Sequence, residues 1–261
     1  MAFSLDQFRL DGKVAVVTGA GGRGNSIGRA YALGLGAAGA KVVVADLNPA
    51  GAEAVAQEVR DAGGEAISVG VDISDRAAVD AMAAKVREAF GGADILVNNA
   101  AMMADMNFSA SIEYPMDAWN RILNVNLTGA LNCCQAIVPQ MRERGGGKIV
   151  NQVSGGAFPA QSVYGVTKLA LTGLTTTLAT ELGRSGINVN AIAPGNVLTD
   201  AGKSITPDEG PFKTKLEMTV VGRVSGQPDE LVGPLLLLCS PAGNWIHGQT
   251  LHVDGGWILR P

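Results

Sequence analysis

Short apolar runs alternate with longer amphipathic segments along the whole chain. The runs are rich in Val, Ile and Ala on both faces, as in strands of a parallel sheet that helices cover on both sides. The segments between them carry helix signals, such as the proline that begins 49–62. We therefore expect strands at 13–18, 41–46, 66–71, 94–97, 148–153, 187–193 and 249–253, and helices at 26–38, 49–62, 75–90, 117–141, 162–182 and 227–239.

This alternation predicts one doubly wound α/β (Rossmann) domain over 1–261, with a parallel sheet of about seven strands and helices on both faces. Ligands of such a sheet bind beyond the carboxyl ends of its strands. The 35 glycines are nearly twice the usual share of about 7% and fit many tight turns. The polar segment 199–220 is expected to form a mobile lid over the substrate.

Composition argues against a nucleic-acid or membrane partner. The net charge is −4, and no basic stripe is present. The longest apolar run, 235–239, is far too short to span a membrane, and the charged N-terminal residues do not look like a secretion signal. Cys133, Cys134 and Cys239 show no metal-binding spacing. We expect reduced, buried thiols in a cytoplasmic protein that binds no metal.

Tyr164 and Lys168 are candidate catalytic residues because they lie four residues apart on a predicted helix, on the same face. Lowering a tyrosine pKa from about 10 to about 7 takes roughly 4 kcal/mol. A cation about 4 Å away supplies about 4 kcal/mol at an effective dielectric of about 20. Lys168 is therefore expected to make Tyr164 an acid or base near neutral pH, with the Ser154 hydroxyl available upstream. The pair alone would also fit an ordinary surface helix.

A glycine-rich loop, T-G-A-G-G-R-G-N-S-I-G-R-A at 18–30, follows the first strand. Such a loop presents backbone N–H groups and a helix N-terminus to a pyrophosphate. The second strand ends in Asp46, whose carboxylate suits the ribose hydroxyls of NAD and repels the extra phosphate of NADP. Arg23 in the loop could instead pair with that phosphate. The sequence favours NAD over NADP but leaves both open.

Two further strand ends carry polar residues. Asp72 ends the third strand, where it could reach an adenine, and Asn98-Asn99-Ala100 ends the fourth, beside the centre of the cofactor. These residues and the glycine loop resemble those of the short-chain dehydrogenase/reductase family, in its shorter single-domain branch. The resemblance covers essentially the whole chain. It rests also on N-N-A-A at 98–101, Asn126 in N-V-N-L-T-G, Ser154, Tyr164-x-x-x-Lys168, Pro194-Gly195 and the closing H-V-D-G-G at 252–256.

The resemblance implies reversible hydride transfer between a secondary alcohol and a ketone in a homo-oligomer, a tetramer or dimer. Tyr164 would be the general acid/base, and Lys168 would lower its pKa and hold the nicotinamide ribose. Ser154 would hydrogen-bond the substrate oxygen, and Asn126 would order a water that relays protons. The implied cofactor-binding residues are Gly19, Arg23, Ser26, Ile27, Gly28, Asp46, Leu47, Asp72, Ile73, Asn99, Ala100, Ala101, Tyr164, Lys168, Pro194, Gly195, Val197 and Thr199.

Three features depart from the family pattern: the glycine loop, the residue at 101 and the interval from Ser154 to Tyr164. Thr18 and Gly28 are ten residues apart where seven is usual, so three residues are inserted, and Ser26 replaces the middle glycine. We expect an altered loop that still binds phosphate, through the Ser26 hydroxyl. Ala101 replaces a glycine, a minor change. Ser154 precedes Tyr164 by ten residues where thirteen is usual, which reshapes the substrate pocket.

The sequence is also compatible with other functions. A longer glycine loop also occurs in the enoyl-reductase branch, which usually spaces its tyrosine and lysine farther apart. The chain could be an NADPH-dependent reductase of 3-oxoacyl thioesters, or a nucleotide-binding sensor without catalysis. His247 and His252 are expected to be structural, and Trp245 and Trp257 to lie in the core or at a subunit contact. The last candidates, Met102, Met103 and Met106, fit either loop packing or an apolar pocket wall.

Overall fold

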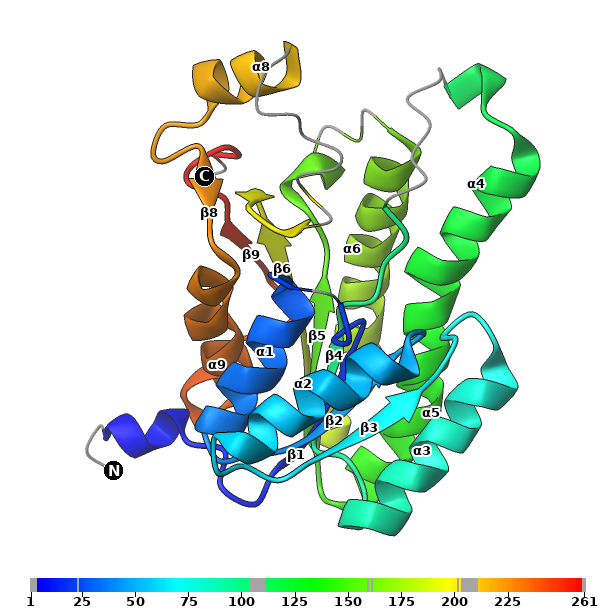
Figure 1. Cartoon of the computed structure of the whole chain (residues 1–261), viewed down its shortest axis with the longest axis vertical. Coiled ribbons are helices and arrows are strands. Elements are labelled where there is room, and N and C mark those ends of the chain that lie inside the picture. The colour runs from blue at the N-terminus through cyan, green and yellow to red at the C-terminus, as the bar shows by residue number, and fades with distance from the viewer. Residues whose placement is uncertain are drawn as a thin grey trace.

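The computed structural model describes residues 4–22, 24–103, 111–158, 160, 162–200, 202 and 211–259. Within these residues the chain forms a seven-stranded parallel sheet with the order β3-β2-β1-β4-β5-β6-β9 (Figure 1). The predicted doubly wound fold and the seven predicted strands are confirmed. The strands are β1 Val14–Thr18, β2 Lys41–Asp46, β3 Ala66–Gly70, β4 Ile95–Asn98, β5 Gly147–Gln152, β6 Ile187–Pro194 and β9 Thr250–Val253.

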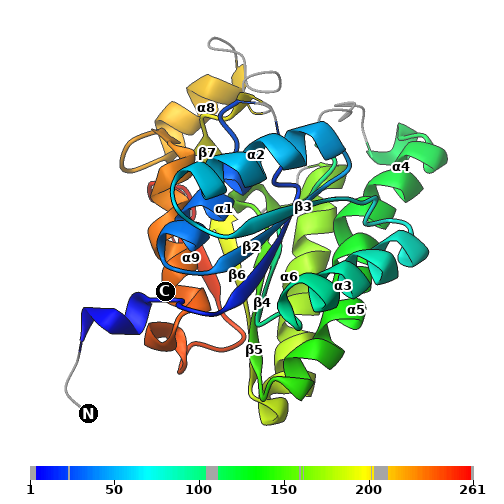
Figure 2. The same cartoon turned by 60° about the horizontal axis from the view of Figure 1, so that its bottom comes forward.

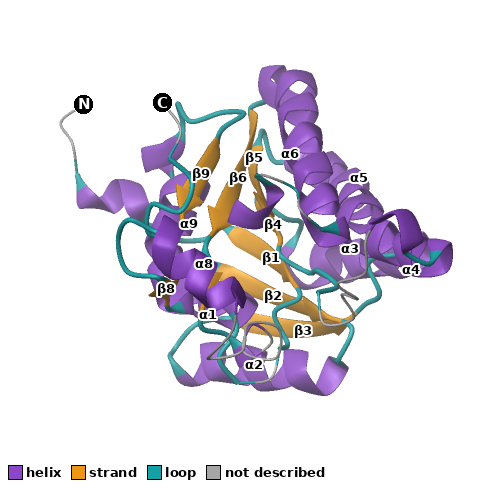
Figure 3. Ribbon diagram, turned by 90° about the horizontal axis from the view of Figure 1, so that it is seen from above, coloured by secondary structure: helices purple, strands orange, loops and turns teal. Residues whose placement is uncertain are grey.

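Helices cover both faces of the sheet, as the strands' apolar side chains require (Figure 3). On one face lie α1 Ile27–Ala37, α2 Pro49–Asp61 and α9 Val232–Cys239. On the other lie α3 Arg76–Phe90, α5 Gly129–Glu143 and α6 Val163–Leu182, which Figure 2 shows together on one side. Four of these helices begin after a side chain that accepts a hydrogen bond from the first turn, namely Ser26, Asn48, Asp75 and Ser162.

The predicted helix at 117–141 has three parts. It begins as α4 Met116–Leu123, passes through a π-helical turn at Asn124–Thr128 and continues as α5. The π turn is a local widening of the helix, often seen at functional sites. It brings Asn126 into the interior, where only 1% of its surface is exposed.

Other differences from the predicted elements are short. The helix expected at 227–239 starts with a 3₁₀ turn at Pro228–Leu231 before α9. A small second sheet, in which β7 Asn196–Val197 pairs with β8 Ser225–Gly226, was not predicted. In the expected lid, residues 211–219 form α8 Pro211–Thr219, while 201 and 203–210 lie outside the described residues. Figure 1 places α8 and the start of α4 at the same end of the molecule.

The order of the strands reverses between β1 and β4, where the next strand in sequence changes side. Dinucleotides bind at such a switch point, outside the carboxyl ends of the strands. We call the ends of β1, β4, β5 and β6 at this place the carboxyl edge. The three cysteines are buried and unpaired. None of the helices described is both long enough and apolar enough to cross a membrane.

Candidate functional site

The first turn of α6 brings Tyr164 and Lys168 together, as their spacing predicts. Ser162 ends the preceding loop, and its hydroxyl accepts a hydrogen bond from the Gly165 N–H at 3.0 Å, which fixes the start of the helix. The Lys168 Nζ atom lies 5.5 Å from the centre of the Tyr164 ring. Both side chains project beside the end of β5.

Lys168 is almost fully buried, with 1% of its surface exposed. Its Nζ donates a hydrogen bond of 2.7 Å to the backbone carbonyl of Gln152, the last residue of β5. Because burial removes water from the ammonium group, the pKa of Lys168 is lowered to about 7. This lysine can therefore change its charge near neutral pH.

Burial has the opposite effect on Tyr164, because here it disfavours the charged phenolate and raises the pKa above its ordinary value. A hydrogen bond with the Ser154 side chain works in the other direction and lowers the pKa of Tyr164. Lys168 was expected to lower the pKa of Tyr164, but the pKa is raised, and the group that lowers it is Ser154. The expected lowering requires a fully charged lysine in a partly wet site, whereas burial removes water from both groups.

The turn that follows Ser154 packs against the start of α6 and keeps Ser154 near Tyr164. The Ser154 Oγ accepts a hydrogen bond from the Gly156 N–H at 3.1 Å, and the 3₁₀ turn Gly155–Ala157 follows directly. A Cβ atom on Gly165 would lie 2.7 Å from the Gly156 carbonyl oxygen, so this turn packs against the start of α6. The interval of ten residues, short for the family pattern, thus still joins Ser154 to Tyr164.

Asn126 connects the π turn to two other parts of the site. Its Oδ1 accepts a hydrogen bond from the Met102 N–H at 2.7 Å, and its Nδ2 donates to the Met102 carbonyl at 3.2 Å. The same Nδ2 donates to the Thr167 Oγ1 at 3.1 Å, next to Lys168 in sequence. The Asn126 side chain therefore holds the loop after β4 against α6.

The ends of β1 and β4 are locked together by Thr18, which sequence reasoning did not single out. Its Oγ1 accepts hydrogen bonds from the N–H groups of Asn99 and Ala100, both at 3.1 Å. In return, the Asn99 Nδ2 donates to the carbonyls of Thr18 and Gly19, both at 2.9 Å. Gly19 has a φ of +66°, and a Cβ there would lie 2.5 Å from the Ala100 Cα. A polar residue that ends an apolar strand was the signal for Thr18.

The start of α1 fits a phosphate group. The Ser26 Oγ accepts a hydrogen bond from the Arg29 N–H at 3.3 Å, so this hydroxyl acts first as a helix cap. Among the described residues, the N–H groups of Ile27 and Gly28 have no acceptor. A Cβ on Gly28 would lie 2.3 Å from the Gly19 carbonyl oxygen, so only glycine allows this approach. Two free amides at a helix N-terminus suit the pyrophosphate of a dinucleotide.

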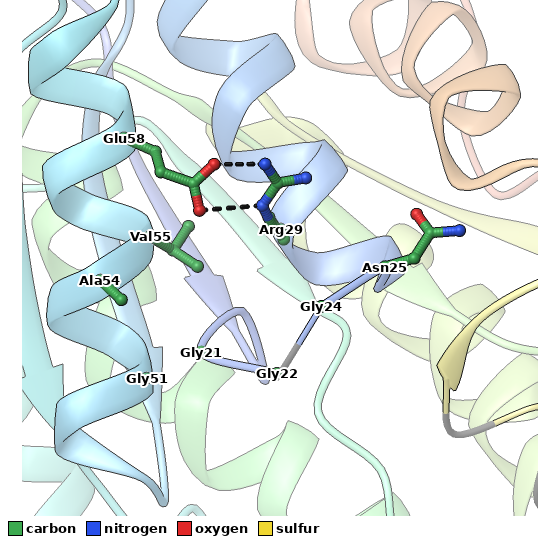
Figure 4. A pocket seen from close by; sticks show the side chains of 9 residues that line it. All are labelled: Gly21, Gly22, Gly24, Asn25, Arg29, Gly51, Ala54, Val55 and Glu58. Atoms are coloured by element: carbon green, nitrogen blue, oxygen red, sulfur yellow. Dashed lines mark hydrogen bonds and ion pairs between the residues drawn. The ribbon is translucent and has the colours of Figure 1, made fainter.

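Asp46 lies beside the glycine loop with its orientation fixed. Its Oδ2 accepts a hydrogen bond from the Gly21 N–H at 2.8 Å, and its Oδ1 accepts from the Asn48 N–H at 2.9 Å. A hollow of about 530 Å³ opens between this loop, α1 and α2 (Figure 4). In it, Arg29 and Glu58 form a two-pronged ion pair, so the Arg29 cation is already balanced. Arg23 lies outside the described residues.

The remaining predicted cofactor residues flank the same edge. Asp72 is exposed and accepts hydrogen bonds from the Ser74 N–H at 2.9 Å and the Ser74 Oγ at 2.7 Å. The Thr199 Oγ1 accepts from the Gly202 N–H at 2.8 Å. The others follow or end β2, β3, β4 and β6: exposed Leu47 and Ala101, buried Ile73 and Pro194, and half-buried Gly195 and Val197.

The histidines and tryptophans agree only in part with their predicted places. His247 is structural, as predicted, because its ring nitrogens bind the Val189 N–H at 3.3 Å and the Ala179 carbonyl at 2.7 Å. The His252 ring packs 5.3 Å from the Phe158 ring, centre to centre. Trp257 packs on Gly155, behind Ser154. Trp245 is 99% exposed, so of its two predicted places the core is wrong, and a subunit contact stays a prediction.

The methionines after β4 agree with part of their prediction. Met102 is half-buried and packs on a cluster formed by Tyr114, Ile122 and Val163, next to Tyr164. Met103 is also half-buried, and Met106 lies outside the described residues. Met102 thus contributes apolar surface beside the candidate catalytic tyrosine.

Comparison with known proteins agrees with this fold and site. A family model described as enoyl-(acyl carrier protein) reductase matches residues 22–258. An uncharacterised oxidoreductase of Mycobacterium tuberculosis (strain ATCC 25618 / H37Rv) is 47% identical over 251 residues, 96% of this chain and 99% of the relative. Among solved structures, a 7α-hydroxysteroid dehydrogenase complexed with NADH and 7-oxo glycochenodeoxycholic acid has a TM-score of 0.89 and 36% identity, with 99% of both chains covered.

A second solved structure is a gluconate 5-dehydrogenase of Burkholderia cenocepacia J2315 in complex with NADP and tartrate. It has a TM-score of 0.89 and 37% identity, and the match covers 98% of both chains. The similarities extend over nearly the full length of this chain and of its relatives, at identities well above those that indicate a shared fold alone. The chain therefore belongs to the short-chain dehydrogenase/reductase family of oxidoreductases.

Proposed function

We propose that this protein is an NAD(H)-dependent oxidoreductase that interconverts a secondary alcohol and a ketone. The observation that carries the proposal is the hydrogen-bonded Ser154 and Tyr164 pair beside buried Lys168 at the carboxyl edge. These groups offer a proton donor, a second hydroxyl for the substrate oxygen and a cation that titrates near neutral pH. The amides of Ile27 and Gly28, from which no described residue accepts a hydrogen bond, lie at the start of α1, where a dinucleotide phosphate would bind.

Each group has a separate proposed role. The Tyr164 hydroxyl gives a proton to the ketone oxygen in reduction, and the Tyr164 phenolate takes the proton of the alcohol in oxidation, while Ser154 donates a hydrogen bond to the same oxygen. Lys168 holds the nicotinamide ribose and stabilises the Tyr164 phenolate when it forms. Asn126 orders a proton-relay water near Lys168. The nicotinamide, when bound, supplies the hydride chemistry, and it would also add positive charge near Tyr164 in its oxidised form.

Asp46 supports NAD over NADP. Its carboxylate is fixed by two backbone N–H groups at the end of β2, where it can accept hydrogen bonds from ribose hydroxyls. A 2′-phosphate at this place would meet the negative charge. The relatives include one structure with NADH and one with NADP, so both cofactors occur among similar proteins. We expect NADH to bind more tightly than NADPH.

The substrate is proposed only as a class, a small secondary alcohol or ketone. The named relatives act on a hydroxysteroid and on gluconate, which share a secondary hydroxyl group and little else. The proposal also includes a homo-oligomer, a tetramer or dimer, and a cytoplasmic location. The closest competing function is an NADPH-dependent reductase of 3-oxoacyl thioesters, and the cofactor comparison separates the two.

A Tyr164→Phe variant tests the proposal. The variant should lose nearly all turnover of a panel of secondary alcohols and ketones, while its dissociation constant for NADH stays within about twofold of the wild type. Full activity would rule out Tyr164 as the acid/base. NADH binding by the wild-type protein without turnover of any substrate would favour a nucleotide-binding sensor.

A further inference from the structure

The inserted part of the glycine loop is tied to the segment that follows β6. The Asn25 Nδ2 donates a hydrogen bond of 2.6 Å to the Leu198 carbonyl. The Asn25 N–H donates to the Asp200 Oδ2 at 3.1 Å, and the Asp200 N–H donates to the Asn25 carbonyl at 3.0 Å. Three hydrogen bonds thus join residues far apart in the sequence. We call this set of contacts the Asn25 link.

The backbone next to Asn25 is shaped for this contact. Gly24 has a φ of +64°, which side-chain-bearing residues rarely adopt. A Cβ built on Gly24 would lie 1.9 Å from the Asp200 Oδ2. Both the conformation and the close approach require glycine, so the loop and the Asp200 carboxylate fit together without spare room.

The position of the Asn25 link makes it relevant to the cofactor. The glycine loop comes from β1 and the 198–200 segment from β6, and β4 and β5 lie between these strands in the sheet. A ligand that contacts both the start of α1 and the Ser154–Tyr164 pair would extend across the ends of β1, β4 and β5, which lie within the span of the link. In Figure 4 the Asn25 side chain points away from the Arg29–Glu58 pair, consistent with its bond to Leu198.

The partners of Asn25 also flank one predicted cofactor residue. Leu198 and Asp200 stand on either side of Thr199, whose side chain is 8% exposed and binds the Gly202 N–H. The link therefore fixes the backbone on both sides of Thr199. The amides of Ile27 and Gly28 have no acceptor among the described residues, so the contact does not use the groups that suit a phosphate.

We propose that Asn25 is a positioning residue that closes the carboxyl edge over a bound nicotinamide dinucleotide and slows its release. The proposal rests on the proposed function, because it assumes that this site binds NAD(H). Asn25, in the lengthened glycine loop, supplies a side chain that reaches the segment after β6. Breaking the Asn25 side-chain bond weakens the bridge without removing any group that contacts the phosphate.

An Asn25→Ala variant of the full chain tests this role. NADH is bound to the protein and displaced by excess NAD⁺, and the dissociation rate is read from the loss of NADH fluorescence in a stopped-flow instrument. We expect release to be about fivefold faster than in the wild type, the effect of losing one hydrogen bond. An Asn25→Leu variant, similar in volume but without the donor, should release NADH equally fast.

Asn188→Ala is the matched control. Asn188 also uses its Nδ2 to bind backbone carbonyls of a distant segment, those of Asn244 and Ile246, both at 3.1 Å. It lies near the amino end of β6, away from the proposed site. We expect its NADH dissociation rate to match the wild type, even if its melting temperature falls as much as that of Asn25→Ala.

The outcomes separate this role from the proposed function. If wild-type protein binds NADH but Asn25→Ala and Asn25→Leu release it at the wild-type rate, the Asn25 link is only structural and the inference is overturned. If Asn188→Ala speeds NADH release as much as Asn25→Ala does, the inference is also overturned. The faster release would then result from a general loss of stability. Absence of NADH binding by the wild-type protein overturns the proposed function itself, and the role of the link with it.

Discussion

Lys168 and Tyr164 respond to burial in opposite directions, although both lose contact with water. Removing water disfavours the ammonium of Lys168 and the phenolate of Tyr164, so the pKa of the lysine falls to about 7 and that of the tyrosine rises. At neutral pH the lysine is then only partly charged, which weakens its attraction for a phenolate. The spacing of the two residues was readable from the sequence, but the burial that sets their charge was not.

A Lys168→Met variant tests the cost of this buried amine. Because the folded-state pKa is about 7 and the ordinary value about 10.5, Lys168 binds more protons in the unfolded chain between these pH values, and its own contribution to stability rises with pH in that window. The destabilisation is complete below pH 7 and disappears toward pH 10.5. Lys168→Met should lose this rise, on the order of a few kcal/mol in total.

The measurement is the free energy of unfolding in urea, taken at several pH values from about 7 to about 10. Lys85→Met, a substitution at an exposed lysine of α3, should keep the pH slope of the wild type. Equal slopes in Lys168→Met and the wild type would show that the Lys168 pKa is not lowered.

Asp46→Asn tests the proposed cofactor choice at one side chain. Asparagine keeps the shape and one acceptor for the Gly21 or Asn48 N–H, but it removes the negative charge that would repel a 2′-phosphate. The ratio of the NADPH and NADH dissociation constants should fall about tenfold, which corresponds to about 1.4 kcal/mol. Fluorescence titration with each cofactor measures it.

Asp72→Asn is the control for this charge change. Asp72 follows β3, the strand next to β2, and accepts hydrogen bonds from Ser74, whereas Asp46 accepts one from the glycine loop. Its cofactor ratio should stay near that of the wild type. A similar fall in both variants would mean that general charge, and not the position of Asp46, sets the preference.

At the scale of elements, α6 depends on its first turn to present Tyr164. Ser162 caps this turn through the Gly165 N–H, so Ser162→Ala should lower the free energy of unfolding by about 1 kcal/mol. Turnover should fall as well, because Tyr164 lies in the turn that frays. Ser162→Asp should keep most of both properties, since aspartate is also a good cap. Equal losses in the two variants, measured by urea unfolding, would contradict a capping role.

The strands and most helices were readable from sequence because their signals are local. Runs such as 41–46 are apolar on both faces, and Pro49 or Ser162 marks a helix start. The π turn at Asn124–Thr128 was not readable, because Asn126 is held there by Met102 and Thr167 through hydrogen bonds distant in sequence. The two-residue strands β7 and β8 carry too few residues for a period-2 pattern.

In the candidate site, too, the features with local sequence signals were predicted and those set by distant contacts were not. Tyr164 and Lys168 are neighbours on one helix, so their spacing alone predicts the contact. Thr18 and the Gln152 carbonyl bind their partners only after β1, β4 and α6 have packed, and sequence reasoning missed both. The Ser26 hydroxyl was expected to bind phosphate but caps α1, a role that its place before the helix equally allows.

At the scale of the whole molecule, the carboxyl ends and the amino ends of the strands carry different kinds of residues. We call the amino ends of β1, β4 and β5 the amino edge. The proposed functional groups gather at the carboxyl edge. At the amino edge the carboxylate of Asp94, 5% exposed, accepts hydrogen bonds from the Val14 N–H at 2.9 Å and from Arg144 at 2.8 and 3.1 Å. Its backbone carbonyl accepts from the Lys148 N–H at 2.9 Å. One residue thus joins β1, the start of β4, β5 and the end of α5.

Asp94→Asn should therefore destabilise the fold without weakening cofactor binding. The variant leaves Arg144 without its carboxylate in a partly buried place, which should cost about 1–3 kcal/mol of unfolding free energy, less than for a fully buried pair because Arg144 is partly exposed. Arg87→Ala, which breaks the exposed pair with Glu143, should change stability little. The dissociation constant for NADH should remain within about twofold of the wild type in both, since the sheet separates the edges. If Asp94→Asn instead weakened NADH binding in step with stability, the two edges would be coupled, and the carboxyl edge could not be treated as a site that the rest of the fold merely supports.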